Sequence, residues 1–483
     1  IAGSDEGGSG SWRVMSKLER DGQEFRHVNA TYPRYIANSV KATVEEFDRT
    51  DGTIVVNAST FGGYGHNRFI EWHRSATTDP EDAAGDDYTV LVSEGDLFIL
   101  DPYADSYPST RAYAALERTD SNALYDQLNR AFRDGDADHF ERRFCSPEDI
   151  ERFLEAFADV TGHGPRGKQA EFVREVDHSV AVLQGPPGPG KTSFTLAPAV
   201  LARLAAAESD GDRLLTVVTA PSHTAVDEAM TDIVENWQAY TRGGGDMART
   251  QFIRVGSRDD SADGTATPVG EHVEFVDYYD TGDVHRATSY LRPHVDAGES
   301  EDSAESHLVV FTTPTSLRGL IDKCAGDLFG LDGAEEVMDA GISFVDLLTI
   351  DEASMLDLPS TLLSSAFLSD GSQTLLIGDH RQMEPVQQHD WEGEDRRTIE
   401  ENVPFMSVLN FVRFLRGDLE ETEFAFAHSP EIGDAIPITR LDRTYRLHQR
   451  VAKLLTDLVY TDDGIRLRST RTDTIEPITP RTD

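Results

Sequence analysis

The chain has 483 residues, 38% of them apolar, which is enough for about two to four domains with packed cores. Its formal net charge of −43, from 44 basic and 87 acidic residues, excludes binding of nucleic acid through a broad basic face. No apolar run approaches the roughly 18 to 20 residues that span a bilayer, which argues against a membrane protein.

The acidic residues are spread among hydrophobic patterns, so an acidic disordered protein is not expected. A carboxylate-rich surface stays hydrated in a cytosol of very high salt, where repulsion is screened over about 3 Å at 1 M ionic strength. We therefore expect a halophilic, cytoplasmic protein that would bind nucleic acid through stacking, backbone amides and hydroxyls. The two cysteines, Cys145 and Cys324, lack CxxC spacing, so we expect reduced thiols and no structural zinc site.

The first 165 residues divide into a strand-rich part and a helical part. Residues 40–102 alternate or run apolar between Gly and Asp punctuation, which predicts a small barrel-like domain over 1–110. Residues 111–165 have helical periodicity and predict a helical stalk. Within them, Ser146 followed by acidic residues predicts a helix N-cap and an acidic first turn.

Residues 166–435 alternate between strand and helix patterns, which predicts an α/β fold with a mostly parallel sheet. The stretch 257–305 interrupts this alternation, because it holds thirteen acidic residues against three arginines and is rich in Gly and Ser. We interpret it as an acidic insertion.

A phosphate-binding loop is predicted where the motif GxxxxGK[ST] follows a buried strand and precedes a helix. Its backbone N–H groups would curl around a β-phosphate, Lys191 would reach the β- and γ-oxygens, and the Thr192 hydroxyl would face Mg²⁺. Pro198 lies inside the following helix and predicts a bend there. The candidate nucleotide-binding residues of this loop are Gly185, Pro186, Pro187, Gly188, Pro189, Gly190, Lys191, Thr192 and Ser193.

Two later strands end in polar residues suited to phosphate chemistry. "VDLLTIDEASM" places Asp351 and Glu352 after an apolar run, where one acid can hold Mg²⁺ and the next can polarise the attacking water. "TLLIGDHRQMEPV" places Gln382 just beyond another buried strand, where a glutamine can contact the γ-phosphate. A polar turn is the alternative interpretation of this second motif.

The set of motifs over residues 166–465 resembles superfamily 1B helicases, in the group that contains the nonsense-mediated-decay helicase, senataxin and the replication helicase–nuclease. The motifs occur in the family's order, namely GPPGPGKT, VTAPSHTAVDEAM, IDEAS, GDHRQMEP and LDRTYRLHQRVAKLLTDLVY. The resemblance implies a RecA-like P-loop NTPase that uses ATP and Mg²⁺ and moves along single-stranded DNA or RNA. It also implies that residues 436–483 begin a second, incomplete RecA-like domain.

The resemblance assigns roles to single residues. It implies that Gln169 reads adenine, that Tyr445 stacks on it, and that Arg446 is an arginine finger. Lys191, Glu352, Gln382 and Arg446 are then the candidate catalytic residues, with Thr192 and Asp351 as metal ligands. Strand contacts are implied for Pro221, Ser222, Thr224, Thr312 and Thr313.

The chain also departs from the family's pattern. Pro189 stands where the family has Thr, and Met355 and Thr444 stand where it has Gln. The change at 355 weakens the expected link between the Mg²⁺-binding strand and the motif around Gln382. The last two family motifs have no counterpart before Asp483, and the chain begins at Ile1. We therefore expect an excerpt of a longer protein, in which a nuclease or another module can lie outside this segment.

Two other functional classes compete with a motor. A nucleotide-gated clamp or signalling ATPase that binds a partner protein fits the acidic composition and the altered motif at 355. A metabolic kinase is disfavoured, because the motifs around 221 and 382 have no role there. RNA and DNA remain equivalent, since hydroxyl and backbone contacts suit both.

The composition yields a direct test. Because repulsion among 87 acidic residues is unscreened at low ionic strength, the melting temperature should rise steeply with salt. It can be followed by circular dichroism between about 0.1 M and several molar KCl. A flat profile would contradict the halophilic interpretation.

Overall fold

The computed structural model divides the chain into two compact units, Ile1–Pro108 and Ser109–Asp483. In the first unit it describes the backbone of four strands only. The described residues are 11–16, 39–48, 53–57 and 98–102 in the first unit and 114–116, 118–141, 144–245, 247, 250–257, 272–295, 307–385, 406–419 and 429–471 in the second.

The first unit contains an antiparallel four-stranded sheet in the order β3-β2-β1-β4. β1 (Ser11–Ser16) pairs with both β2 (Ser39–Asp48) and β4 (Phe98–Pro102), while β3 (Thr53–Asn57) pairs with β2. Among the described strands β3 and β4 are the two edges, and the barrel-like domain expected over 1–110 stays a prediction.

The second unit is built on an eight-stranded sheet in the order β12-β5-β11-β10-β6-β9-β7-β8, and all its pairings are parallel. This confirms the predicted α/β fold. The strands are β5 (Val180–Gln184), β6 (Leu215–Thr219), β7 (Thr250–Gly256), β8 (Val273–Asp277), β9 (His307–Thr312), β10 (Val345–Ile350), β11 (Leu368–Gly378) and β12 (Ile438–Arg440).

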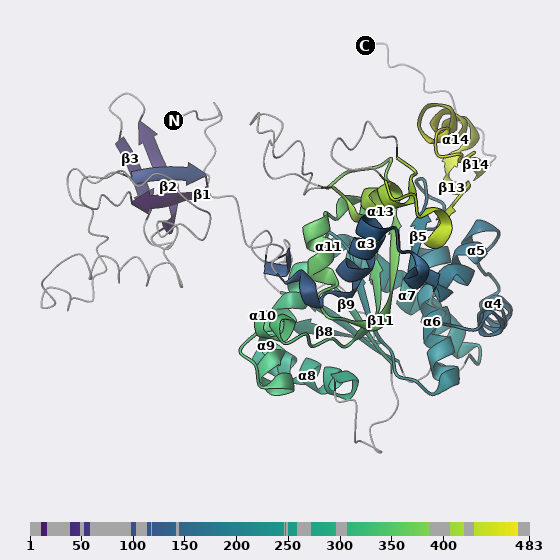
Figure 1. The fold of residues 1–483 in the computed structure, drawn as a ribbon, viewed down its shortest axis with the longest axis horizontal. Coiled ribbons are helices and arrows are strands. Elements are labelled where there is room, and N and C mark those ends of the chain that lie inside the picture. Colours follow the sequence, from purple (N-terminus) through teal and green to yellow (C-terminus); the bar gives the residue numbers. More distant parts are fainter. Residues whose placement is uncertain are drawn as a thin grey trace, which may run out of the picture. The chain divides into compact units, whose positions relative to one another are not determined.

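Helices cover both faces of this sheet (Figure 1). The described helices are α3 (Ala123–Asp134), α4 (Pro147–Thr161), α5 (Lys168–Arg174), α6 (Ala197–Asp210), α7 (His223–Arg242), α8 (Thr281–Val295), α9 (Pro314–Phe329), α10 (Ala334–Asp339), α11 (Leu358–Ser364), α13 (Val408–Arg416) and α14 (Gln449–Leu455).

The period-2 alternation of the strands separates the apolar side chains into two cores. Val180 and Val182 of β5 face the core that α3, α8, α9, α10 and α13 share, whereas Ala181 and Leu183 face the core of α4 to α7. β5 is therefore buried on both sides, as is usual for the inner strands of a parallel sheet.

The predicted stalk over 111–165 is not a separate element. Leu124 of α3 lies in the first core and Phe153 of α4 in the second, so these helices pack on opposite faces of the sheet. Their amphipathic patterns were identified correctly, but periodicity does not reveal which surface a helix covers. The predicted N-cap is confirmed, since the Ser146 side chain accepts a hydrogen bond from the Asp149 backbone N–H at 3.1 Å.

The expected acidic insertion at 257–305 also needs correction where it is described. Residues 273–277 form β8, which pairs in parallel with β7 at the sheet edge, and α8 packs on it. Val276 and Leu291 are buried, while the acidic residues that dominated the composition include exposed ones such as Asp280. Residues 258–271 and 296–306 of the expected insertion lie outside the described residues.

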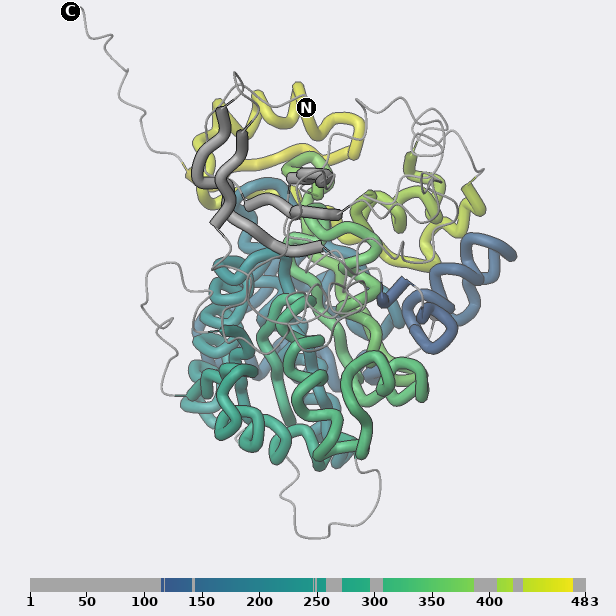
Figure 2. Tube along the Cα trace, turned by 90° about the vertical axis from the view of Figure 1, so that its left-hand side faces the viewer, coloured from purple at the N-terminus to yellow at the C-terminus, as the bar shows by residue number. Residues whose placement is uncertain are grey.

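Residues 436–440, which were expected to begin a second domain, belong to the eight-stranded sheet and its core. β12 (Ile438–Arg440) pairs in parallel with β5, and Ile436 is fully buried in the first core. Beyond it, β13 (Arg443–His448) and β14 (Arg468–Arg471) form a two-stranded parallel sheet with α14 packed against both. Figure 2 shows this segment, in yellow, at one end of the second unit. In the described part of the chain, no helix combines the length and apolarity needed to cross a membrane.

Candidate functional site

The phosphate-binding loop follows β5 and leads into the helix that ends with α6. Gly185 N–H donates to Gly378 O at 3.1 Å, which ties the start of the loop to the end of β11. Gly188 and Gly190 adopt positive φ values of 77° and 76°, a region that glycine enters without strain. Lys191 at the loop's end is 9% exposed. The loop therefore has the turned backbone that a phosphate cradle requires.

The first helical turn after the loop is π-helical, over Thr192–Leu196. Leu196 N–H donates to Lys191 O at 2.8 Å, and Pro198 follows without an N–H to give. The wide turn accommodates the proline where the sequence predicted a bend. The Ser193 hydroxyl donates to Asp232 Oδ2 at 2.5 Å and its carbonyl accepts from Asn236 Nδ2 at 3.2 Å, so this predicted nucleotide ligand contacts α7.

Two carboxylates at the end of β10 face the loop. Thr192 Oγ1 donates to Asp351 Oδ2 at 3.1 Å, and Lys191 Nζ lies 3.9 Å from Glu352 Oε1. Asp351 is 4% exposed, and burial raises its pKa to about 6, with the charge of Glu352 adding to the rise and that of Lys191 opposing it. The parallel sheet thus joins residues about 160 positions apart in the sequence, as predicted.

The oxygen atoms of Thr192 and Asp351 fit a magnesium ion. Mg²⁺ prefers hard oxygen ligands and takes few from the protein, leaving the others to water and phosphate. A cation here would offset the burial of the Asp351 carboxylate. Within the described ranges, no group of three or more His, Cys, Asp or Glu residues is placed to hold a metal, so any such site would rely on the nucleotide for further ligands.

Gln382 lies in the loop after β11. Its Nε2 donates to Asp379 Oδ2 at 2.8 Å, and its backbone N–H donates to Asp379 O at 2.9 Å. Asp379 is fully buried. The glutamine is thereby held against a rigid carboxylate at the same sheet edge as Glu352.

A cavity of about 250 Å³ lies between this edge of the sheet, at Glu352 and Gln382, and the start of α7. Ser222 caps α7 by accepting from Ala225 N–H at 3.2 Å, and Thr224 is exposed on its first turn. The residues that line the cavity are Pro221, Ser222, Thr224, Ala225, Glu228, Glu352, Met355, Gln382 and Met383.

The other two predicted strand contacts lie elsewhere. Thr312 is fully buried and its hydroxyl donates to Thr313 O at 3.1 Å. Thr313 is 4% exposed and caps α9 by accepting from Ser316 N–H at 3.3 Å. Neither lines the cavity.

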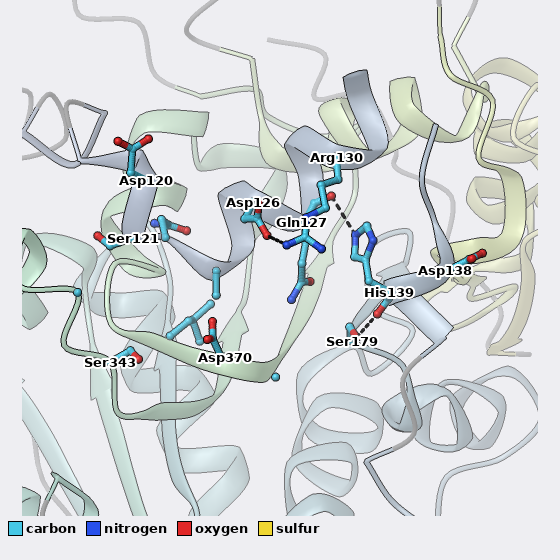
Figure 3. Close-up of a pocket in the computed structure, with 15 residues that line it drawn as sticks. Asp120, Ser121, Asp126, Gln127, Arg130, Asp138, His139, Ser179, Ser343 and Asp370 are labelled. Carbon is cyan, nitrogen blue, oxygen red and sulfur yellow. Dashed lines mark hydrogen bonds and ion pairs between the residues drawn. The ribbon is translucent and has the colours of Figure 1, made fainter. Parts of the chain in front are cut away.

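A larger cavity, of about 650 Å³, contains none of the predicted site residues (Figure 3). It lies at the opposite, amino end of the strands, where Ser179 precedes β5 and Ser343 precedes β10. Ligands of open parallel sheets bind beyond the carboxyl ends of the strands, so the smaller cavity is the better candidate.

The predicted base-binding residues flank the phosphate-binding loop. Gln169 is 6% exposed; its Nε2 donates to Pro189 O at 2.9 Å and its Oε1 accepts from Arg166 N–H at 3.2 Å. The rings of Tyr445 and Phe194 are about 40% exposed, at 42% and 39%, and their centroids are 6.4 Å apart. Phe194 was not predicted, because an aromatic residue in an apolar helix pattern reads as core.

β13 lies directly against the loop. Tyr445 N–H donates to Gly188 O at 2.8 Å, and Thr444 Oγ1 donates to Pro187 O at 3.0 Å. The predicted arginine finger, Arg446, is exposed on this strand. The Thr444 hydroxyl therefore ties β13 to the loop. The sequence showed only that this position lacks the family's Gln, and did not indicate this contact.

The close approach of β13 to the loop can be tested with Gly188→Ala. A Cβ at 188 would lie 2.3 Å from Arg446 Cβ, so the strand should shift and the Tyr445 amide should exchange hydrogen faster. Hydrogen exchange read by NMR checks this.

Gly211→Ala is the matched control. Gly211 has φ +75°, similar to Gly188, but a Cβ there meets nothing within 4 Å, so it adds only left-handed strain, about 1 kcal/mol. Equal exchange of the Tyr445 amide in both variants would mean that β13 does not rest on the loop.

Part of the chain matches one family model. Residues 169–388 match a family model described as an AAA domain. No curated protein matches the chain. Among solved structures it is similar to the arterivirus nonstructural protein 10 helicase in complex with DNA, at 14% identity and a TM-score of 0.27.

That alignment covers 69% of this chain and 48% of the viral chain, so the match spans about half the length of that relative. The AAA-domain match includes Lys191, Asp351, Glu352 and Gln382, whereas Tyr445 lies beyond it. The parallel sheet, the glycine-rich loop and the acid pair together make the second unit a RecA-like P-loop domain.

Proposed function

We propose that this chain is an ATP-driven motor, a helicase or translocase of superfamily 1B type, that acts on single-stranded nucleic acid and requires Mg²⁺. The cavity of about 250 Å³ carries the proposal. Glu352 and Gln382, at the nucleotide end, share its walls with Ser222 and Thr224, which resemble the family's strand contacts. A change at the phosphates can therefore reach the strand directly.

Each side chain at the sheet edge has a part in the proposed hydrolysis. Lys191 binds phosphate oxygens, and Thr192 and Asp351 would hold Mg²⁺, which when bound neutralises charge on the phosphates. Glu352, close to Lys191 and open to the cavity, accepts a proton from the attacking water. Arg446 adds positive charge to the transferred phosphoryl group.

The base of the nucleotide is proposed to lie between Gln169, Phe194 and Tyr445. The bonds that Gln169 makes to the loop and to Arg166 use one of its two amide N–H groups and one oxygen lone pair. It retains one donor and one acceptor for an adenine edge. The exposed rings of Phe194 and Tyr445 offer apolar surface on which a base can stack.

A nucleotide-gated clamp is the second candidate, because the cavity itself is acidic. Glu228 lines it beside Glu352, and both would repel a phosphate backbone. A clamp would hydrolyse ATP in response to a partner protein, and single strands would not change its turnover.

The proposed general base is tested by Glu352→Gln. Turnover should fall by about 10²-fold while Mg·ATP affinity is retained, because the amide cannot take a proton. Calorimetry and steady-state assays separate the two quantities. Lys191→Ala, measured in parallel, should lose affinity instead. If Glu352→Gln lost affinity too, this residue would be a metal ligand, and unchanged affinity of Lys191→Ala would refute the phosphate-binding role.

The strand-binding role is tested with Thr224→Ala. A single-stranded oligonucleotide should stimulate ATP turnover of the unchanged protein, and the variant should need about fivefold more oligonucleotide, about 1 kcal/mol for one lost hydrogen bond. Turnover is measured against DNA and RNA concentration at constant salt.

Thr231→Ala is the control, since Thr231 lies on the same helix, is exposed, and donates to Asp227 O at 2.8 Å. It does not line the cavity, so its oligonucleotide dependence should equal that of the unchanged protein. Absence of stimulation by either nucleic acid would refute the motor and favour the clamp.

A further inference from the structure

A buried tyrosine anchors the loop that carries Gln382. This tyrosine belongs to the C-terminal segment, which comprises β13, α14 and β14 and the residues between them. Tyr460 Oη donates to Asp379 Oδ2 at 2.6 Å, and the same carboxylate oxygen accepts from Gln382 Nε2 at 2.8 Å. Tyr460 is 2% exposed. Burial and the neighbouring Asp379 raise the pKa of Tyr460, so the phenol keeps its proton and remains a donor. Asp379 therefore connects the glutamine to a residue about 80 positions later.

A second anchor lies three residues further on, at Asp463. Its side chain is 5% exposed and accepts from Arg381 Nε at 2.9 Å and Nη2 at 3.2 Å. It also contacts His380 Nε2 at 3.1 Å and Gln184 Nε2 at 3.3 Å. Burial alone would raise the pKa of Asp463, yet the hydrogen bonds from His380 and Arg381 hold it well below its usual range.

Both anchors belong to the C-terminal segment, which also contains Tyr445, the residue that contacts the phosphate-binding loop. β14 pairs with β13, and Arg468 N–H donates to Asp442 O at 2.7 Å. Ile465 N–H donates to Tyr460 O at 3.1 Å. The segment thus contacts the phosphate-binding loop through Tyr445 and the Gln382 loop through Tyr460 and Asp463.

We propose that Tyr460 and Asp463 are positioning residues that hold Gln382 in its working place, through Asp379 and Arg381. They also couple the C-terminal segment to the cavity, because Gln382 forms part of its wall. Movement of the segment when nucleotide binds or leaves would then shift Gln382 against the strand. This inference rests on the proposed function for its coupling role.

Two substitutions separate positioning from simple stabilisation. Tyr460→Phe keeps the ring in place and removes only the hydroxyl that Asp379 accepts from. Asp463→Asn keeps the shape and removes the charge that faces Arg381. Asp462→Asn is the control, because it is the same change one residue away on an 85% exposed side chain. Its Oδ2 lies 4.0 Å from Arg381 Nη2, too far for a hydrogen bond, so the change removes a nearby charge without removing an anchor contact.

The measurement is steady-state ATP turnover with and without a single-stranded oligonucleotide, together with melting temperatures. In Tyr460→Phe and Asp463→Asn the strand-stimulated kcat should fall about tenfold while the KM for ATP changes less than about twofold, because misplacement of Gln382 affects the reaction and not nucleotide binding. Asp462→Asn should keep the kcat of the unchanged protein. Loss of stability alone would lower the active fraction at all oligonucleotide concentrations and leave the stimulation ratio intact.

A double-mutant cycle with Gln382→Ala decides whether the anchors act through the glutamine. Tyr460→Phe should lower kcat in the unchanged protein and have no further effect in the Gln382→Ala background. Additive losses would overturn the positioning role, as would a kcat of both anchor variants equal to that of Asp462→Asn. If oligonucleotide fails to stimulate the unchanged protein, the motor is refuted, and the same cycle on unstimulated kcat still judges the positioning role.

Discussion

The parallel pairing of β5, β11 and β10 is the constraint on which the site depends. Parallel strands bring their carboxyl ends to one edge, so the phosphate-binding loop, the acid pair and Gln382 meet although the chain between them is long. The bond from Gly185 N–H to Gly378 O fixes the loop to the end of β11. β12 pairs with β5 at the edge of the same sheet, and the chain continues from it into β13, which contacts the loop. The position of β12 therefore also determines where Tyr445 lies.

The local structure of the phosphate-binding loop and the acid pair could be predicted from the sequence, because the signals for it are local. A glycine-rich loop between a strand and a helix, and acids just after an apolar run, each fit within about a dozen residues. Tyr460 and Asp463 carry no such signal. Their role arises from contacts with Asp379 and Arg381, far away in the sequence, and only the packing of the C-terminal segment brings them together.

The errors in the fold have a related origin. Acidic composition hid β8 and α8, because β8 has only five residues and acidic residues in and around both elements outweigh their apolar spacing in a composition average. The boundary at 436 followed a motif order, whereas a strand of only three residues, β12, decides where the sheet ends. Thr312 and Thr313 were predicted from their position in a motif; register buries both side chains, and their contact with a nucleic-acid strand stays a prediction.

Several arginines of this acidic chain form ion pairs in which one partner is buried. Arg254, 2% exposed, donates to Asp227 at 2.6 Å and so fixes α7 against β7. Arg416, 8% exposed, donates to Asp418 at 2.8 Å, and Arg381 does the same for Asp463. In each pair one partner is buried and the other is partly exposed, so removing the exposed partner leaves the buried charge with fewer hydrogen bonds. High salt weakens exposed ion pairs far more than these, so the contacts that shape the site would persist in brine.

The proline after the phosphate-binding loop has a consequence for the neighbouring helix. In the π-helical register the acceptor opposite residue 198 is the carbonyl of Ser193, and Pro198 has no hydrogen to offer it. Asn236 of α7 supplies that hydrogen from its side chain. Because Pro198 leaves the Ser193 carbonyl without a donor from its own helix, that carbonyl is open to Asn236 of α7. The first turn of α7, at Ser222 and Thr224, lines the cavity. A residue with an amide at 198 would offer the Ser193 carbonyl a second donor, and that oxygen would then no longer depend on α7 for its hydrogen bond.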